Sequence, residues 1–439
     1  ICLKTGTPPR LDRRTINWDI LEPQPGDDPP QPFSYLTREI PLRQVPCHIT
    51  FTNERTHDVI RANLDRSAMY GGHISSVGPR YCPSIEDKCV RFAEKDRHQL
   101  FLEPEGLDTN EIYANGISTS LPEDAQRALV ATIEGLENAR IVRVGYAIEY
   151  TYVPPSQINS TLSVKDVDGL YLAGQINGTT GYEEAGAQGL MAAVNAVLEL
   201  RGQEPFGLGR DEAYIGVLMD DLVTKEHREP YRMFTSRAEY RLLLRQDNAD
   251  LRLTDYAWKL GLISEDRYRQ FDKYRGAING EIDRLKAASF KKTDVDAELA
   301  ASYGLDRLES GIKVAQMLAR PEIGYADLQR MGCANGELSN AVGDDDAARA
   351  IEQVELFIKY EGYIARQLAQ VQRDAKLETT RLPADLDYGL MHGLRSEAQQ
   401  KLATIRPETI GQAGRIAGVN PADITVILIH LKARQSAAA

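Results

Sequence analysis

The chain has few cysteines, and none of them form a recognisable pair. Its 439 residues include five cysteines, at positions 2, 47, 82, 89 and 333, with no CxxC spacing. A sparse and odd set argues against a disulfide framework or a zinc site and indicates a reducing compartment. The seven histidines show no HExxH or similar ligand spacing, so we expect no bound metal.

Long apolar runs are also missing. The longer uninterrupted stretches, such as 190–194 and 426–429, are far shorter than a bilayer span. No basic and then apolar leader opens the chain, so we expect a cytoplasmic protein that does not enter a membrane. The first residue is Ile1 rather than methionine, inside a predicted strand at 1–4. We therefore expect a fragment that is truncated at its N-terminus.

The overall composition is that of a globular chain with an acidic balance. Hydrophobic residues make up 42% and charged residues 26%, and the length allows two or three domains. The net charge of −12 argues against general coating of nucleic acid. An RNA site on this chain would therefore be a local basic patch.

The pattern of predicted elements changes along the chain. Residues up to about 77 are rich in proline and threonine, with short strand-like runs such as 47–52. Residues 78–205 alternate helices, at 84–95 and 184–200, with strands near 98–103, 141–145 and 169–173. From about 206 onward helical periodicity dominates, with one apolar stripe through 345–377 and an N-cap at Asn420 before Pro421. We predict an α/β lobe with an inserted β-rich subdomain, followed by an all-α C-terminal part.

The most informative segment is a glycine-rich turn at 169–189. A predicted strand runs into Gly174, Gly178 and Gly181, and a helix rich in small residues follows. Glycines allow a close backbone approach to a ligand, and the helix N-terminus suits a pyrophosphate or a flavin edge. A tight turn packed for its own sake is the alternative, and the glycines alone would favour it. The added polar side chains at 175, 177, 180 and 184 favour a cofactor site instead.

A second segment, 78–92, places Cys82 just before a predicted helix. Ser84 can cap that helix in a capping box with Asp87, and Arg80 lies two residues from the cysteine. A helix N-terminus and a nearby arginine both favour the nucleophilic thiolate. An inert structural cysteine is the alternative for Cys82. Cys89, farther along the helix, is interpreted as a small buried hydrophobic residue.

A third segment carries arginines at regular spacing. Ser236 and Glu239 predict another capping box, and Arg237, Arg241 and Arg245 then share one helical face. Such a stripe, with Arg232 just before it, fits RNA phosphates. Spacing alone favours the alternative, a solvated face held by salt bridges.

These segments together resemble the MnmG (GidA) family of tRNA uridine 5-carboxymethylaminomethyl modification enzymes. The likeness runs from Leu3 to Lys432 and includes 3–10, 78–92, 173–196, 229–241, 406–416 and 421–423. Departures are few: Ala68, Cys89 and Ala193 stand where the family has proline, an aliphatic residue and glycine. The flavin lobe that would carry a G-x-G-x-x-G turn and a second catalytic cysteine has no counterpart here, so we expect weak or no binding of FAD.

The resemblance implies a homodimeric FAD enzyme that oxidises NADH and takes a one-carbon unit from methylenetetrahydrofolate. With glycine or ammonium it would build the substituent on C5 of the wobble uridine 34 of tRNA, together with a tRNA-modification GTPase. It also implies the domain order: 1–8 in the FAD-binding domain, 9–77 an inserted β-rich subdomain, 78–205 the rest of a partial, Rossmann-like FAD-binding domain, 206–380 a helical domain, and 381–439 a small bundle contacting the GTPase.

The candidate site residues follow from the three segments and the resemblance. Cys82 is the candidate catalytic residue, and Arg232, Arg237, Arg241 and Arg245 are the candidates for tRNA. The candidates for FAD are Gly174, Gln175, Asn177, Gly178, Thr180, Gly181, Glu184, Gly186 and Gly189. The stretch implied to bind the nicotinamide dinucleotide is Gly78, Pro79, Arg80, Tyr81, Cys82, Pro83, Ser84, Ile85, Glu86, Asp87, Lys88, Cys89, Val90, Arg91 and Phe92.

Three other functions compete with this hypothesis. A folate- and FAD-dependent tRNA uridine-54 methyltransferase would share the flavin fold but not the long helical part after 206. A general NADH–flavin reductase would explain neither that part nor the arginines. An inactive fragment that only binds tRNA and the GTPase is the alternative from a different class.

Overall fold

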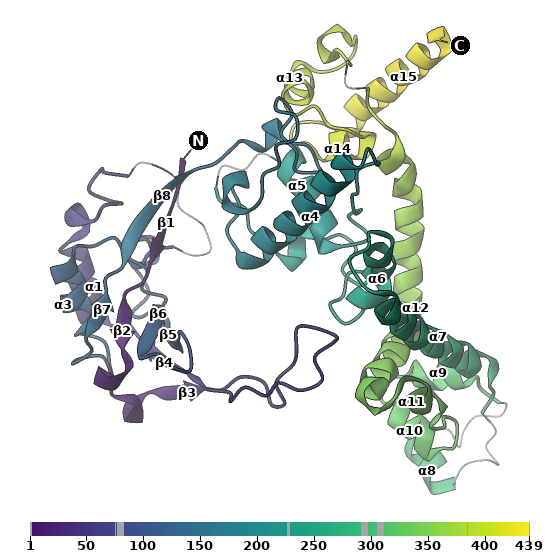
Figure 1. The fold of residues 1–439 in the computed structure, drawn as a ribbon, viewed down its shortest axis with the longest axis horizontal. Helices are drawn as coiled ribbons and strands as arrows, with labels where there is room; N and C mark the ends of the chain where they lie inside the picture. Colours follow the sequence, from purple (N-terminus) through teal and green to yellow (C-terminus); the bar gives the residue numbers. More distant parts are fainter. Residues whose placement is uncertain are drawn as a thin grey trace. The chain divides into compact units, whose positions relative to one another are not determined.

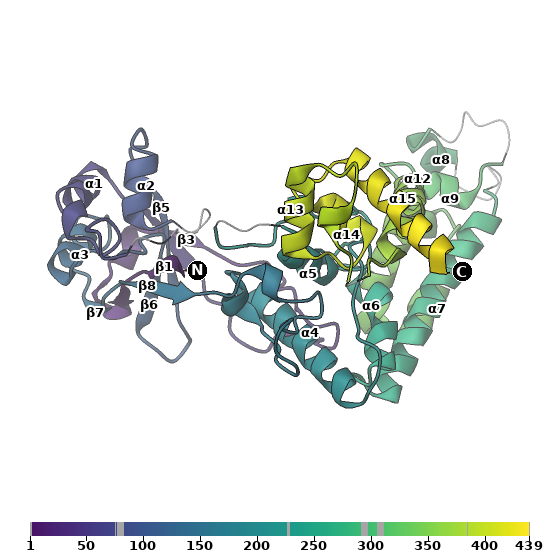
Figure 2. The same cartoon turned by 90° about the horizontal axis from the view of Figure 1, so that it is seen from above.

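The computed structural model describes residues 2–74, 76, 83–225, 229–290, 297–304, 311–383 and 385–438. These residues form two compact units, drawn in Figures 1 and 2. Unit 1 is Ile1–Ala192 with Glu226–Arg232, and unit 2 is Ala193–Lys225 with Met233–Ala439. The helix α4 (Tyr182–Leu200) begins in the first unit and ends in the second.

Unit 1 contains a two-stranded ribbon that leads toward the glycine-rich turn. The strand β1 (Cys2–Thr7) confirms the prediction at the start of the chain, and it pairs antiparallel with β8 (Tyr146–Thr151). The chain leaves β8 at Tyr152, which is almost fully buried. The end of the ribbon therefore places Tyr152 next to the glycine-rich turn, which follows later in the chain.

The main sheet of unit 1 has six strands in the order β3-β4-β5-β6-β2-β7. These strands are β2 (Arg10–Asp12), β3 (Glu22–Gln24), β4 (Cys47–Phe51), β5 (Gln99–Pro104), β6 (Glu111–Asn115) and β7 (Ile141–Arg143). All its strand pairs are antiparallel. The sheet thus crosses the expected boundary between residues 77 and 78, because β5, β6 and β7 pair with strands from the first part of the chain.

Three helices pack on this sheet: α1 (Glu54–Arg61), α2 (Ile85–Arg91) and α3 (Glu123–Val130). Their buried side chains share one core with the sheet, for example Ile60 and Leu129 with Leu100 and Ile112. The helix expected over 84–95 ends four residues early. Its last turn is closed by the bond from the Phe92 N–H to the Lys88 carbonyl, and the charged residues 94–97 offer it no further apolar face.

Unit 2 is helical, with no strand longer than an isolated bridge in its described part. Its largest core is built from α7 (Glu265–Ala287), α9 (Val314–Leu318), α10 (Tyr325–Arg330), α11 (Glu337–Val342) and α12 (Asp344–Thr379). The helices α5 (Tyr214–Thr224), α6 (Ala249–Lys259) and α8 (Ala297–Ser302) also belong to this part. The predicted stripe on α12 is buried at Val354 and Ile358, whereas Phe357 and Leu368 are exposed.

The C-terminal bundle has a core of its own. It consists of α13 (Ser396–Ile405), α14 (Ile410–Arg415) and α15 (Pro421–Ala438). The predicted start of α15 is confirmed: the Asp423 N–H donates to Asn420 Oδ1 at 3.0 Å, and the Asn420 N–H donates to Asp423 Oδ2 at 2.9 Å. The fold class is therefore a mixed α/β region followed by a helical C-terminal part, as predicted. No described helix combines the length and apolar character that a membrane span requires.

Candidate functional site

The glycine-rich turn of unit 1 is shaped by two glycines with left-handed backbone. Gly174 (φ +83°) opens the 3-10 helix η5 (Gly174–Asn177), and Gly178 (φ +77°) ends it. A side chain is disfavoured at such φ values. At Gly178 a Cβ would also lie 3.0 Å from the ring of buried Tyr152. The prediction of a strand over 169–173 is wrong, since Tyr171 alone among these residues forms a β-bridge, to Ser163.

Buried hydrogen bonds hold the turn against α4, and Gln188 is their centre. Its Oε1 accepts from the Gly174 N–H at 3.0 Å and from Asn177 Nδ2 at 2.8 Å, and its Nε2 donates to Thr179 Oγ1 at 2.9 Å. Thr179 in turn donates to the Gly174 carbonyl at 3.0 Å. Neither residue is among the site residues predicted from the sequence. The spacing of Gln188 four residues after Glu184, on the same helical face, is the signal that could have identified it.

Asn177 carries a buried acceptor that has no hydrogen-bond partner among the described residues. The Oδ1 atom of Asn177 is buried, although the Nδ2 atom of the same side chain is fully used. A buried polar atom of this kind calls for a partner such as a ligand or a water. Along α4, a Cβ added at Gly186 or Gly189 would meet nothing within 4 Å, so the helix surface at these residues is uncovered within the chain.

A segment distant in sequence joins the turn. Tyr231, which is fully buried, pairs with Thr179 in a parallel bridge. Its N–H donates to the Gly178 carbonyl at 2.8 Å, and its carbonyl accepts from the Thr180 N–H at 2.9 Å. The candidate tRNA residue Arg232 therefore directly follows, in the chain, a residue whose backbone is hydrogen-bonded to the candidate flavin turn.

The side chain of Gln175 is exposed at the outer edge of the turn. Beneath it, the Val153 N–H donates to the Ile176 carbonyl at 2.8 Å and fixes the turn to the end of the ribbon. Burial raises the pKa of the nearby Tyr150 hydroxyl, and its contact with Gln175 lowers it in part. Gln175 thus has an exposed side chain on a backbone segment that is held in place.

The second candidate segment is only partly described, because 78–82, including Cys82, lies outside the described residues. In α2, Ser84 Oγ accepts from the Asp87 N–H at 3.2 Å, as predicted. The other half of the predicted capping box is not seen. The carboxylate of Asp87 instead accepts from the Tyr70 hydroxyl at 2.7 Å, and this contact adds to burial in raising the pKa of Tyr70.

The remaining candidates for the nicotinamide dinucleotide divide by exposure. Glu86 is fully buried, and its Oε1 accepts from the Ser120 N–H at 2.9 Å and from Thr119 Oγ1 at 3.1 Å. Ser84, Ile85, Asp87 and Cys89 are buried too, whereas Val90, Arg91 and Phe92 are exposed. Only these last three side chains, with the partly exposed Pro83 and Lys88, are open to a ligand as the chain stands.

The prediction of a helix over 236–245 is wrong. Only Thr235–Arg237 forms a 3-10 turn, so Arg237, Arg241 and Arg245 do not share a helical face. The Glu239 carboxylate, which the predicted capping box needs, is instead bound by Arg210, which is 7% exposed and donates to that carboxylate at 2.9 Å and to the Arg237 carbonyl at 3.1 Å. These contacts with a residue distant in sequence hold the segment in a non-helical conformation.

The four arginines also differ in their exposure and in their ion pairs. Arg245 lies 3.1 Å from Asp247, and Arg237 lies 3.8 Å from buried Asp221. Arg232 and Arg241 have exposed side chains. The alternative of a salt-bridged surface thus holds in part for Arg237 and Arg245.

Comparisons with known proteins agree along the whole chain. Three family models match: glucose inhibited division protein A over residues 1–204, and two for the tRNA modifying enzyme MnmG/GidA, its C-terminal helical domain over 265–368 and its C-terminal helical bundle over 368–439. The tRNA uridine 5-carboxymethylaminomethyl modification enzyme MnmG of Pelobacter propionicus is 54% identical over 435 residues, which are 99% of this chain and 68% of that protein. The enzyme of the same name from Geobacter metallireducens is 55% identical over 98% of this chain and 68% of its own length.

A solved structure has the same fold. GidA of Aquifex aeolicus, in its form II crystal, superposes with a TM-score of 0.84 at 44% identity, over 98% of this chain and 67% of that one. The α/β unit with its glycine-rich turn and the helical C-terminal part thus define a tRNA-modifying class of enzyme. The chain belongs to the MnmG/GidA family.

Proposed function

We propose that this chain takes part in building a carboxymethylaminomethyl or aminomethyl group on C5 of uridine 34 in tRNA. The names of its relatives support the reaction class. Within the chain, the observation that carries the proposal is the turn at Gly174–Gly189, with its buried and unpartnered acceptor at Asn177. Turns of this kind, placed before a long helix, suit a cofactor with phosphates or a polar ring edge.

FAD is the cofactor that we propose for this turn, and the residues present fit one. Gly174 and Gly178 would hold the backbone of the turn in its left-handed shape, and Asn177 Oδ1 would accept from a ring or ribityl donor. Gln175, Thr180 and Glu184 would add polar contacts, and Gly186 and Gly189 would leave room along α4. When bound, the flavin would supply the electron transfer that links NADH to the one-carbon unit of methylenetetrahydrofolate.

Cys82 is the residue that we propose for the chemistry on uracil. C5 of uracil is a weak nucleophile until a thiolate adds to C6, and an acid/base group must afterwards remove the C5 proton. Cys82 would perform one of these two steps. Glycine or ammonium would provide the nitrogen of the new substituent.

The macromolecular partners are tRNA, a tRNA-modification GTPase and a second copy of the chain. We propose that Arg232, Arg237, Arg241 and Arg245 contact tRNA phosphates, with Arg232 and Arg241 contributing most because their side chains are exposed. The bundle at 381–439 is the proposed contact for the GTPase. It has an independent core, so it can present a surface of fixed shape.

The deciding experiment is mass analysis of tRNA nucleosides from cells that lack the gene and from cells that carry it. We expect loss of the modified wobble uridine without the gene and its return with it. Cys82→Ser should fail to restore the nucleoside, whereas Cys2→Ser, at an exposed cysteine with no assigned chemistry, should restore it fully.

The same analysis separates the alternatives. Loss of 5-methyluridine at position 54 instead would identify the methyltransferase. If wobble uridine is unchanged while the purified chain still retards tRNA in electrophoresis, the chain only binds. Normal modification with Cys82→Ser would contradict the catalytic role of that cysteine.

A further inference from the structure

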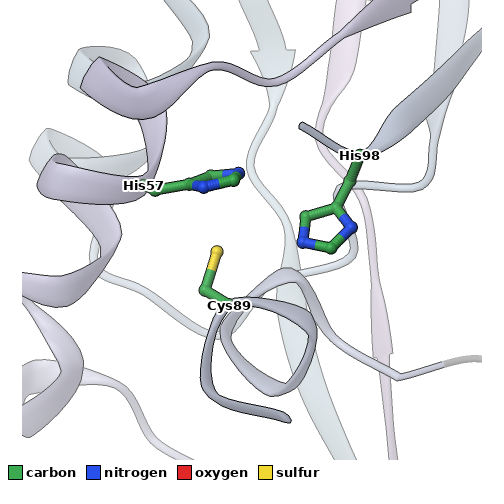
Figure 3. Close-up of side chains that lie close together, drawn as sticks. All are labelled: His57, Cys89 and His98. Carbon is green, nitrogen blue, oxygen red and sulfur yellow. The ribbon is translucent and has the colours of Figure 1, made fainter. Parts of the chain in front are cut away.

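Three side chains that are distant in sequence meet inside unit 1. His57 comes from α1, Cys89 from α2, and His98 from the residue before β5. Figure 3 shows the three pointing toward one another. One potential ligand atom of each lies within 4.8 Å of the other two, and all three residues are at most 8% exposed.

Thr52 orients both histidines. Its Oγ1 lies 2.8 Å from Nε2 of His57 and accepts from the backbone N–H of His98, also at 2.8 Å. Because Nε2 of His57 is used in this way, Nδ1 is the nitrogen left to face the cluster. A histidine whose second nitrogen is hydrogen-bonded is the usual arrangement around a bound metal.

The second histidine has an unused nitrogen in the interior. Nε2 of His98 is buried and has no hydrogen-bond partner among the described residues. Leaving a buried polar atom unpaired costs free energy, so such atoms are uncommon unless a ligand completes them.

We propose that His57, Cys89 and His98 form a binding site for a borderline-soft divalent cation, with Zn²⁺ as the preferred ion. Two imidazole nitrogens and one sulfur suit Zn²⁺ and disfavour Mg²⁺ and Ca²⁺, which prefer oxygen ligands. The fourth position would be taken by water. This site is separate from the proposed flavin turn and goes beyond the proposed function.

The spacing needs only a small adjustment. Zinc bonds of about 2.0–2.3 Å in a tetrahedral arrangement put ligand atoms roughly 3.4–3.7 Å apart. The present limit of 4.8 Å means that the side chains would close by about 1 Å on binding. On binding, the Cys89 thiol gives its proton to solvent and the thiolate sulfur bonds the ion; no electron is transferred.

The ion would join three elements of unit 1. It would hold α1, α2 and the start of β5 together, and α2 directly follows the segment that carries Cys82. We therefore expect bound metal to stabilise unit 1 and to fix α2, which follows that segment. Without metal, the same residues are a packed pair of rings, with centroids 5.2 Å apart and planes tilted by 40°, over a thiol.

The test uses the full chain, stripped with a chelator, kept reduced with a phosphine, and titrated with Co²⁺ and then Zn²⁺. We expect one Co²⁺ per chain with a sulfur-to-cobalt charge-transfer band, which Zn²⁺ abolishes by displacement. Cys89→Val, which keeps the packing volume, and His98→Phe, which keeps an aromatic ring, should lose the band and bind at least about 100-fold more weakly. Each removes a direct ligand, and loss of a group that only hydrogen-bonds a ligand already costs about 10- to 100-fold.

Two further variants sharpen the result. Thr52→Val should keep the band but weaken binding by about 10- to 100-fold, because it removes only the group that orients the histidines. Cys47→Ser, at a half-buried cysteine in the same sheet, should bind like the unmodified chain. A band of equal strength in Cys89→Val, or no band in the unmodified chain, would overturn the proposal.

A measurement without variants covers the case in which they do not fold. Alkylation of Cys89 in the unmodified chain can be followed by peptide mass analysis with and without Zn²⁺. We expect Zn²⁺ to slow alkylation at Cys89 by at least about 10-fold, through occupancy of the thiolate, and to leave Cys2 unaffected. Equal rates at Cys89 in both samples would refute the site.

Discussion

Replacing Gly178 with alanine tests the shape of the turn most directly. Its left-handed backbone, at φ +77°, makes a Cβ unfavourable by about 1–2 kcal/mol. The same Cβ would lie 3.0 Å from the Tyr152 ring, which is 4% exposed and packed on all sides. Overpacking of this kind adds about 1–3 kcal/mol. We therefore expect Gly178→Ala to destabilise unit 1 by roughly 2–5 kcal/mol.

Gly169 provides a matched control in the same unit. Its φ is +72°, but a Cβ there would meet nothing within 4 Å. Gly169→Ala should therefore cost only the backbone contribution, about 1–2 kcal/mol. The difference between the two variants isolates the contact with Tyr152.

Urea unfolding followed by tryptophan fluorescence can measure this difference. The chain has two tryptophans, Trp18 in unit 1 and Trp258 in unit 2. In a Trp258→Phe background the signal comes from Trp18, which donates to the Arg13 carbonyl at 2.9 Å in the folded unit. Equal losses for Gly178→Ala and Gly169→Ala would refute the close packing of Tyr152 on the turn. Adding Tyr152→Leu to Gly178→Ala should recover part of its loss.

Three other predictions concern charged side chains. Arg210→Gln should destabilise unit 2 by about 3–5 kcal/mol, because it leaves the fully buried Asp221 with one fewer cation. Arg269→Gln, at a side chain that is 67% exposed, should change the stability by less than about 0.5 kcal/mol. Both are measured by urea unfolding in a Trp18→Phe background, in which the fluorescence comes from Trp258. Arg14 and Arg140 hold the pKa of Asp12 well below its usual range, so the contribution of Asp12 to the free energy of unfolding is complete above about pH 4 and is lost as the pH falls. The stability of Asp12→Asn should therefore depend less on pH in this acid range. An unchanged acid unfolding profile would count against this linkage. Arg241→Ala should weaken tRNA binding and lower the slope of log affinity against log salt concentration by about 1. Arg269→Gln is the control that should leave both unchanged. An equal slope in both variants would remove Arg241 from the interface.

Local features could be predicted from neighbouring residues alone. Helix α15 begins where Asn420 and Pro421 predict it, and Gly174 and Gly178 of the glycine-rich turn take the left-handed angles that only glycine adopts easily. These features depend on bonds and angles within a few residues, so local residue types are sufficient. The family resemblance, carried by several long segments, also rested on the sequence alone and is confirmed.

Features that depend on distant partners could not be predicted in this way. The pairing of β5, β6 and β7 with the first part of the chain follows from strand contacts between segments far apart, which no local pattern encodes. Residues 236–245 have good helical periodicity, yet Arg210, which is distant in sequence, binds the Glu239 carboxylate and the Arg237 carbonyl. His57, Cys89 and His98 have no motif spacing, because three separate elements bring them together in the core.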